Sequence, residues 1–457
     1  MGLKARNKNS VVLILALFFN LIAAKSQTSV LDTYIEQGLE NNLALQQKTD
    51  SYQQSIQDLR EARGMFFPSL SFDARATVAE GGRTIEFPVG DLLNPVYSTL
   101  NMLTSSNQFS ELTNEAIPFL RPFEHETKLQ VVQPLYNPQI YYNHKIKSNL
   151  TQAAMADAGA YKRHLVCEIK TAYYNYLKAV QFNDLLNNTK RLLEENIRVS
   201  ERLYANDKIT IDNVYRSKTE LSKLEQQKAE ALKLENSAAA YFNFLLNRPL
   251  TDSIEIEKDP LIQEPGYSID ELKKNALDTR EELKMLKSYS KAAGNNLRLN
   301  KSLKLPTLLG VVDYGFQGEK YSFTGEDDYM MASLVLRWNI FTGMQNNARI
   351  KKAQINREIT EKKFQELEAA IQLEITNAWY ALQASRKSIE TAQMQSESSQ
   401  KAYHIVSKKY DQGQANLIEY IDARTSMTNA GENLIMARYD YLIKMADYER
   451  AAGLYNF

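Results

Sequence analysis

The side chains that most often carry out chemistry are scattered along this chain. Its four histidines, His125, His144, His164 and His404, stand far apart, and the single cysteine, Cys167, lies in a helix-like segment. The sequence contains no HExxH motif, no pair of cysteines and no phosphate-binding loop with its lysine. Neighbouring acidic residues fall on charged helix faces, where solvation explains them. The sequence therefore predicts neither an enzyme nor a cofactor or metal site.

Composition excludes one class of partner and favours one kind of structure. The 457 residues include 55 acidic and 55 basic side chains, so the formal net charge is zero and the chain as a whole lacks a basic footprint for nucleic acid. Only 17 glycines and 11 prolines occur, which is low by average usage. We therefore expect long uninterrupted helices and no nucleic-acid partner.

Residues 1–26 have the three-part pattern of a secretory signal peptide. Basic residues come first, an apolar run follows over residues 11–22, and small residues precede Gln27. An uncleaved anchor is the alternative, although this apolar run is short for a membrane span of about 20 residues. We expect export and a mature chain that begins at Gln27. We expect no lipid anchor, because no cysteine stands at that position.

The chain repeats itself. Residues Tyr204–Thr219 align with Tyr410–Thr425 at an offset of 206 positions, and Phe67-Pro68 aligns with Leu305-Pro306 at an offset of 238. Leu135 aligns with Ile340 at an offset of only 205. The fall from 238 to 205 places about 33 additional residues in the first copy, before Leu135. An internal duplication therefore organises most of the chain.

Four segments alternate between apolar and polar residues, as strands with one apolar face do. They are residues 67–78, 125–136, 307–317 and 328–341. Each is about ten residues long, which is what a tilted strand needs to cross a bilayer. No segment after the signal peptide approaches 18 continuous apolar residues, so a membrane-spanning form of this chain would have to use strands. Hairpins of a soluble sandwich are the alternative.

Helical segments separate the strands. Apolar and small residues recur at spacings of three and four over 344–410, which is typical of a coiled coil. Each repeat is expected to open with one helix, over 30–63 and from Ser268 to about Leu303. We expect the long helices to span 138–205 and 344–410, and the return helices to span 212–246 and 417–452. The first repeat is then 27–247, the connector 248–267 and the second repeat 268–457.

Four strands are too few to close a barrel, since the smallest single-chain outer-membrane barrels have eight. A membrane-embedded form therefore implies a homo-oligomer. Three copies would supply twelve strands, and their helices would form a continuing hollow bundle.

Several segments resemble the TolC family of outer-membrane efflux proteins. The most specific are Val132–Asn137, Leu336–Gly343, Tyr410–Gly413, Glu419–Thr425 and Ala437–Ile443. The resemblance implies a mostly α fold with transmembrane β-strands, assembled as a homotrimer. Its twelve-stranded β-barrel would contact outer-membrane lipid, and its long α-helical coiled-coil tunnel would lie in the periplasm. It further implies passive conduction of pump substrates to the exterior, in a tripartite efflux or type I secretion system with a periplasmic adaptor and an inner-membrane pump.

The resemblance also implies a pore gate. Family members carry an acidic ring on the helix after the second turn, and this position matches Glu419 and Asp422, which lie on one helical face. Acidic rings make cation-selective constrictions. A solvated helix face is the alternative. The chain departs from the family pattern at Ala415 and Asn213, where a gate-locking Arg and an Asp would stand, so a Tyr or a backbone hydrogen bond becomes the alternative lock.

The two turns between long and return helices are the expected adaptor contacts. Their residues are Asn206, Asp207, Lys208, Gln412, Gly413 and Gln414. Ordinary helical-hairpin turns would look similar, so this assignment rests on the resemblance.

Two questions stay open from the sequence. The long loop 79–124 carries several large apolar residues and is either surface filler or a plug over the barrel mouth. The alternative to a channel is a secreted coiled-coil structural or adhesive protein without a pore, although such a protein has no use for four ten-residue strands.

Overall fold

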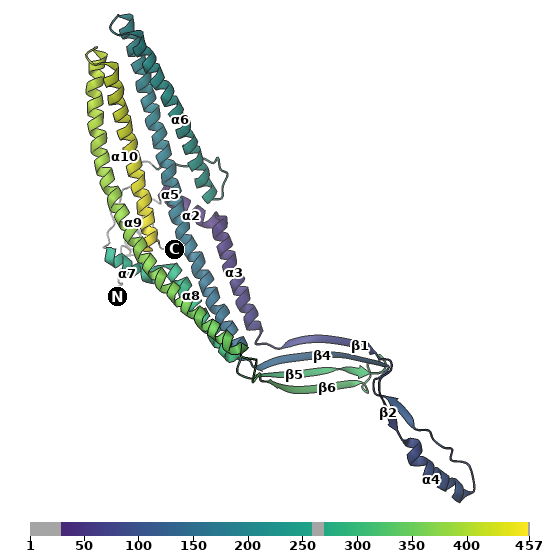
Figure 1. Cartoon of the computed structure of the whole chain (residues 1–457). Helices are drawn as coiled ribbons and strands as arrows, with labels where there is room; N and C mark the ends of the chain where they lie inside the picture. The colour runs from purple at the N-terminus through teal and green to yellow at the C-terminus, as the bar shows by residue number, and fades with distance from the viewer. Residues whose placement is uncertain (1–28, 258–268, 456–457) are drawn as a thin grey trace, which may run out of the picture. The chain divides into compact units, whose positions relative to one another are not determined.

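Helices dominate the computed structural model, which describes residues 29–257 and 269–455 (Figure 1). The mostly helical fold class with a small set of strands is confirmed. The expected signal peptide, 1–26, and the second half of the expected connector lie outside the described residues. In chain order the elements are α2 (Val30–Asn41), α3 (Leu43–Gly64), β1 (Ser69–Val78), β2 (Thr84–Phe87), α4 (Val89–Thr104), β3 (Glu115–Pro118), β4 (Phe123–Tyr136), α5 (Pro138–Ala205), α6 (Ile211–Leu245), α7 (Ile269–Thr279), α8 (Glu281–Ser302), β5 (Thr307–Gly318), β6 (Asp328–Arg337), α9 (Gln345–Asp411) and α10 (Leu417–Ala452).

The chain divides into two compact units, and each unit draws on both sequence repeats. The helical unit comprises residues up to Ser55, Leu150–Ser290 and those from Glu358 onward, whereas the strand unit comprises Ile56–Asn149 and Lys291–Arg357. Elements of both repeats pack together within each unit; in the sheet, β4 of the first repeat pairs with β5 of the second. A repeat is therefore a unit of sequence and not a compact body by itself.

Four antiparallel strands form one sheet in the strand unit, in the order β1-β4-β5-β6. The register gathers the apolar residues of all four strands on one face, in rows such as Phe72, Leu129, Tyr314 and Met330. A slip of one residue would carry a strand's apolar side chains to the other face. The alternation in sequence therefore fixes the register.

The opposite face of the sheet is charged and internally paired. The ammonium of Lys128 lies 3.1 Å from the carboxylate of Glu126 and 3.6 Å from that of Asp313. Asp313 also accepts a hydrogen bond of 2.9 Å from the amide of Gln130, and Arg75 lies 3.5 Å from Glu126. This face is polar across three neighbouring strands.

Two segments of the strand unit differ from the sequence-based expectation. Alternation predicts a strand over 328–341, but β6 ends at Arg337, because its partner β5 begins opposite that residue. Trp338 instead donates from its indole nitrogen to the carbonyl of Lys304 (2.9 Å). The region expected as a long loop, 79–124, contains the β2–β3 hairpin and α4.

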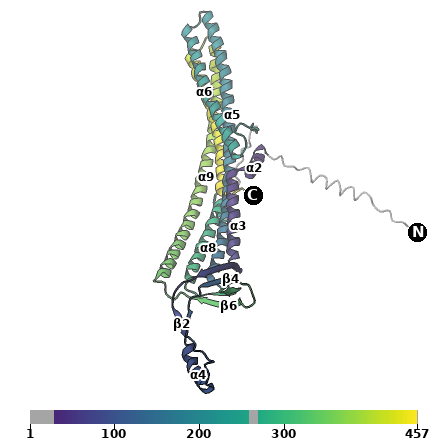
Figure 2. The same cartoon turned by 90° about the vertical axis from the view of Figure 1, so that its right-hand side faces the viewer.

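In the helical unit each repeat supplies one antiparallel helical hairpin. Helix α5 runs beside α6, and α9 runs beside α10 (Figures 1 and 2). Aromatic side chains from both hairpins share one core: the rings of Tyr173 and Phe242 lie 5.5 Å apart, and buried Tyr439 and Tyr448 belong to the same cluster. Burial of these rings is the main contribution to the stability of the packing between the two hairpins in this cluster.

The opening helix of each repeat is broken at equivalent positions, which the sequence did not predict. Asn42 separates α2 from α3, and Arg280 separates α7 from α8. These two residues are 238 positions apart, which is the offset of the duplication in this region.

Each break residue is buried and binds the end of a return helix. The Asn42 amide donates to the carbonyl of Leu245 (2.9 Å), and the Arg280 guanidinium donates to that of Ala451 (2.8 Å). Leu245 and Ala451 are themselves related by the offset of 206. The last carbonyls of a helix have no partner within it, so each break residue satisfies one of them.

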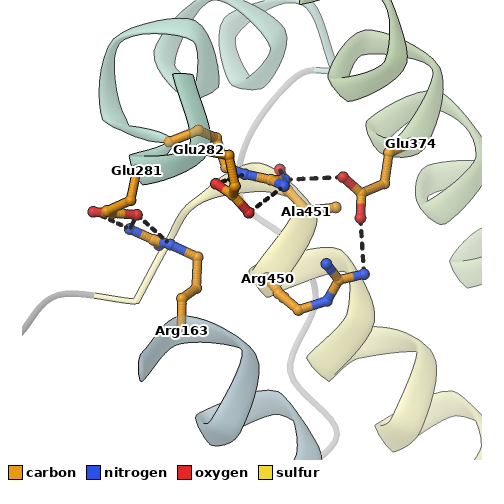
Figure 3. A network of polar contacts seen from close by, with 7 residues as sticks. Arg163, Glu281, Glu282, Glu374, Arg450 and Ala451 are labelled. Carbon is orange, nitrogen blue, oxygen red and sulfur yellow. Dashed lines mark hydrogen bonds and ion pairs between the residues drawn. The ribbon is translucent and has the colours of Figure 1, made fainter. Parts of the chain in front are cut away.

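Arg280 also belongs to a network of buried ion pairs (Figure 3). Its guanidinium contacts Glu282 (2.9 Å) and Glu374 (3.0 Å), and Glu374 in turn contacts Arg450 (2.8 Å). Burial alone would raise the pKa of Glu282, but hydrogen bonds and the charge of Arg280 outweigh it and hold that pKa below its usual value. Beside this network Arg163 makes a two-pronged contact with Glu281, at 2.9 and 3.0 Å.

Replacing Arg280 should destabilise the helical unit strongly. Arg280→Met leaves the partly buried carboxylate of Glu282 without its cation and leaves Glu374 with Arg450 alone, and removing one member of a buried pair typically costs about 3–5 kcal/mol. The measurement is the melting temperature of the detergent-extracted protein, which should fall clearly. Lys387→Ala is the control, because it removes an exposed pair with Glu390 and should leave the melting temperature unchanged. Equal melting temperatures for the two variants would contradict this account.

Candidate functional site

The two turns that end the helical hairpins have the same backbone structure. Asp207 and Gly413 both take positive φ, at 55° and 71°. The next residue in each turn, Lys208 or Gln414, donates its N–H to a carbonyl five residues back, at 2.9 and 2.8 Å. This is the Schellman motif, which satisfies the last carbonyls of a helix. The duplication therefore extends to the detail of the turns.

All six candidate adaptor residues are exposed at these turns. Asn206, Asp207 and Lys208 occupy the α5–α6 turn, and Gln412, Gly413 and Gln414 occupy the α9–α10 turn. These six side chains therefore take no part in the packed core of the chain.

Helix α10 begins with a capping pair that involves one candidate gate residue. The Asn416 side chain accepts from the N–H of Glu419 (2.9 Å) and donates to its carboxylate (2.7 Å). This reciprocal arrangement resembles a capping box and also places a negative charge at the positive end of the helix. Glu419 therefore has a local structural role besides any role in a pore.

Glu419 and Asp422 are both exposed on one side of α10, whereas Tyr420 and Arg424 are buried. The two carboxylates therefore lie on a face that does not pack within this chain. The structure brings the two predicted gate residues together at the start of one helix, next to the α9–α10 turn.

Tyrosines connect the hairpins near the turns. The Tyr410 hydroxyl of α9 lies 2.8 Å from that of Ser200 in α5, which joins the two hairpins, whereas the Tyr403 and Tyr420 hydroxyls, 3.1 Å apart, join α9 to α10 within one hairpin. The rings of Tyr410 and Tyr420 lie 5.1 Å apart, and together with Val199 they are part of one buried cluster. Residues from α5, α9 and α10 therefore meet in a small core at this end.

The second repeat matches a known family model. Residues 272–454 match the family described as outer membrane efflux protein. Outer membrane protein TolC of Escherichia coli (strain K12) is 20% identical over 304 residues, which cover 64% of this chain and 62% of that protein. The Salmonella enteritidis protein of the same name is 24% identical over 34% of this chain and 32% of its own length. Each match spans less than two thirds of the relative.

Solved channel structures share the fold over nearly the whole chain. The Campylobacter jejuni CmeC outer membrane channel has a TM-score of 0.79 at 15% identity, and covers 93% of this chain and 86% of its own. The outer-membrane channel OprN has a TM-score of 0.78 at 16% identity, with coverage of 93% and 90%.

The second repeat is similar to outer membrane efflux proteins, the TolC proteins among them, and the fold over nearly the whole chain is that of solved outer-membrane channels. This confirms the resemblance seen in the sequence. These relatives and solved channels are named as outer-membrane proteins, which agrees with the location expected from the sequence.

Within residues 29–257 and 269–455, no helix combines the length and hydropathy that crossing a bilayer requires. In the same described part of the chain, no group of three or more His, Cys, Asp or Glu side chains is arranged to hold a metal ion.

The two departures from the TolC-family pattern take local partners. Ala415 is half-buried against the tyrosine cluster, and the Asn213 amide donates to Thr210 at the start of α6 (3.1 Å to the hydroxyl). Between the hairpins at this end, the Tyr410 and Ser200 hydroxyls make one of the polar contacts.

One contact between the hairpins was missed by the sequence reasoning. Arg424 of α10 is buried and donates to Glu220 of α6 (2.8 Å), which also receives Lys223 (2.9 Å). Burial alone would raise the pKa of Glu220, but Lys223 and Arg424 outweigh it and hold that pKa below its usual value. The sequence signal that could have indicated this contact is Arg424 itself, a basic residue among the apolar positions of α10, seven residues after Leu417.

Removing Arg424 should loosen the hairpins near their turns. Arg424→Met strips Glu220 of its buried partner, and a charged hydrogen bond of this kind is worth roughly 1.5–3 kcal/mol. Amide hydrogen exchange should therefore be about tenfold faster or more in the first turns of α10, by the usual conversion of 1.4 kcal/mol per factor of ten. Lys223→Ala removes only the exposed partner and is the matched control.

The same pair has a pH dependence with a definite sign. Because the folded pKa of Glu220 is lowered, its contribution to stability is present above the unfolded pKa and is lost as the pH falls through the folded value. The difference in exchange between wild type and Arg424→Met should be full at neutral pH and should shrink in acid. A difference independent of pH would contradict the ion-pair explanation.

Proposed function

We propose that three copies of this chain form an outer-membrane channel that passively conducts pump substrates from the periplasm to the exterior. The observation that carries the proposal is the four-stranded sheet, which has one apolar face and two edge strands of equal length, β1 and β6, with ten residues each. Three such sheets joined edge to edge would make a closed barrel of twelve strands.

Strand edges support the trimer. Edge N–H and C=O groups have no water to bind inside a bilayer, where each unsatisfied group costs several kcal/mol. Closure removes the edges, and four strands are half of the smallest single-chain barrel. Pairing β1 of one protomer with β6 of the next satisfies every edge in the ring.

The exposed apolar face supports a lipid environment. Phe72 and Met330 are 67% and 74% exposed in the single chain, and the neighbouring apolar residues Leu70, Leu334 and Leu336 are exposed to a similar degree. Soluble monomers rarely expose contiguous apolar patches of this kind. Outer-membrane lipid would cover this face, while the charged face around Lys128 would line a water-filled lumen.

The helical hairpins support the remaining partners. In a tripartite efflux or type I secretion system, the channel meets a periplasmic adaptor that links it to an inner-membrane pump. The two exposed turns, with their six candidate residues, are the surfaces we assign to the adaptor. The alternative of a secreted structural or adhesive protein finds no support among the relatives, and it leaves the apolar sheet face unexplained.

Glu419 and Asp422 are the residues we assign to the constriction. Threefold symmetry would bring six carboxylates together from the exposed faces of three α10 helices. Such a ring would attract cations and repel anions.

Conductance in planar bilayers tests both the pore and its gate. Wild type should give small, cation-selective currents. The double variant Glu419→Ala/Asp422→Ala should give larger currents with less selectivity, and the effect should be strongest at low ionic strength, because salt screens fixed charges. The matched control is Glu358→Ala/Glu361→Ala, which removes an exposed acidic pair of the same spacing from α9.

The outcomes separate the two assignments. Absence of current from folded, membrane-extracted wild type would rule out the channel. Currents whose selectivity responds equally to the control and to the Glu419/Asp422 variant would keep the channel and reject the gate.

A further inference from the structure

The residues inserted between β1 and β4 form a folded arm. Strand β2 leads into α4, residues 105–114 return along the helix, and β3 then pairs with β2. Asn94 fastens this return: its amide donates to the carbonyl of Leu112 (2.9 Å) and accepts from the N–H of the same residue (2.8 Å). Asn101 makes the same double contact with Phe109, at 2.8 and 3.1 Å.

A third asparagine completes the fastening from the other direction. Asn114 accepts from the N–H of Asp91 (3.1 Å) and donates to its carboxylate (3.0 Å). Each side-chain amide supplies one donor and one acceptor, as a backbone peptide group does. The hydrogen-bonding groups on the polar side of α4 are therefore used by contacts within the arm.

The other side of α4 is apolar and uncovered. Asn94 and Asn101 are seven residues apart and share one side, whereas Leu92, Val96 and Leu103 project about 180° away at 3.6 residues per turn. We call these three residues the arm stripe; they are 65%, 50% and 76% exposed. A solvated helix turns its polar side to water. Here the polar side is used internally, so the apolar side needs a partner.

The apolar surface continues onto the hairpin. Ile85 lies opposite Ile117 in the antiparallel β2–β3 pair, and Phe87 stands two residues further along β2 toward α4. Phe119 follows β3 at the opposite end of the pair. All four side chains are about half exposed. The uncovered surface therefore runs from the hairpin into the helix.

We propose that the arm stripes of neighbouring protomers pack against one another, so that the occupant of this surface is a second copy of the chain. The inference rests on the proposed trimer. The arm leaves the sheet from β1, an edge strand, so every β1–β6 junction in the ring would carry one arm. It also leaves from the strand end away from the helices, which is the external end of the proposed channel. Rotation would then present three identical apolar stripes to one another.

The charge of α4 argues against a lipid surface as the occupant. Helices that lie on membranes usually carry Lys and Arg on the polar side. Helix α4 contains neither, and its one acidic residue, Asp91, is bonded to Asn114. The return segment also covers the side that would face lipid headgroups.

Disulfide formation by Leu103→Cys in the full-length, detergent-extracted protein tests the contact. Native Cys167 does not compete, because burial raises its pKa to about 11 and keeps it as a thiol. Three thiols around one axis can form one disulfide, so mild oxidation should yield cross-linked dimers with one chain left over in each trimer. Ser98→Cys is the matched control, since Ser98 is exposed on α4 but away from the arm stripe.

Light scattering on the same samples separates the two levels of inference. Absence of trimers would overturn the proposed assembly. Intact trimers in which L103C cross-links no better than S98C would overturn the arm contact alone. Protection of the L103C thiol from maleimide only after lipid vesicles are added would also overturn it, because the occupant would then be the membrane.

Discussion

Two open strand edges set the main constraint on this molecule. A single chain leaves the outer backbone groups of β1 and β6 unpaired, in a sheet whose apolar face is exposed in the single chain. Neither problem can be solved inside one chain, because the helical unit uses its own apolar side chains in the aromatic core. The requirement to pair the edges leads directly to a ring of copies. The same ring would bring together three copies of the acidic face of α10 and three copies of the arm.

The internal duplication explains why one chain can supply a repeating segment of such a ring. The two repeats contribute equivalent hairpins and equivalent turns, and they also share the break that caps the return helix, with Asn42 in one and Arg280 in the other. The residue types have diverged while the bond has been kept. Arg280 adds ion pairs that Asn42 cannot make, so the second repeat holds its return helix more firmly.

Sequence patterns predicted the parts of the fold that depend on local periodicity. The strands and long helices follow from alternation and from spacings of three and four, which act over neighbouring residues. The helix breaks were missed, because the partner of Asn42 lies 203 residues away and nothing local marks the capping bond. Helix α4 was read as a loop, since Pro88 and Pro95 argue against a helix and the asparagine contacts that secure it appear only in three dimensions. At the candidate site, Glu419 and Asp422 could be placed on one face, whereas the Arg424–Glu220 pair joins two repeats and was invisible.

The contacts between the hairpins change in kind along the helical unit. Around Tyr173 and Tyr439 they are buried rings, whose separation would expose a large apolar area to water. Near the turns the buried cluster is smaller, and polar contacts accompany it: the Ser200–Tyr410 hydroxyl pair and the Arg424–Glu220 ion pair. A typical hydrogen bond contributes only about 1 kcal/mol net, because water replaces it when it breaks. The larger aromatic core is therefore expected to contribute more to holding the hairpins together than the smaller cluster and the polar contacts near the turns.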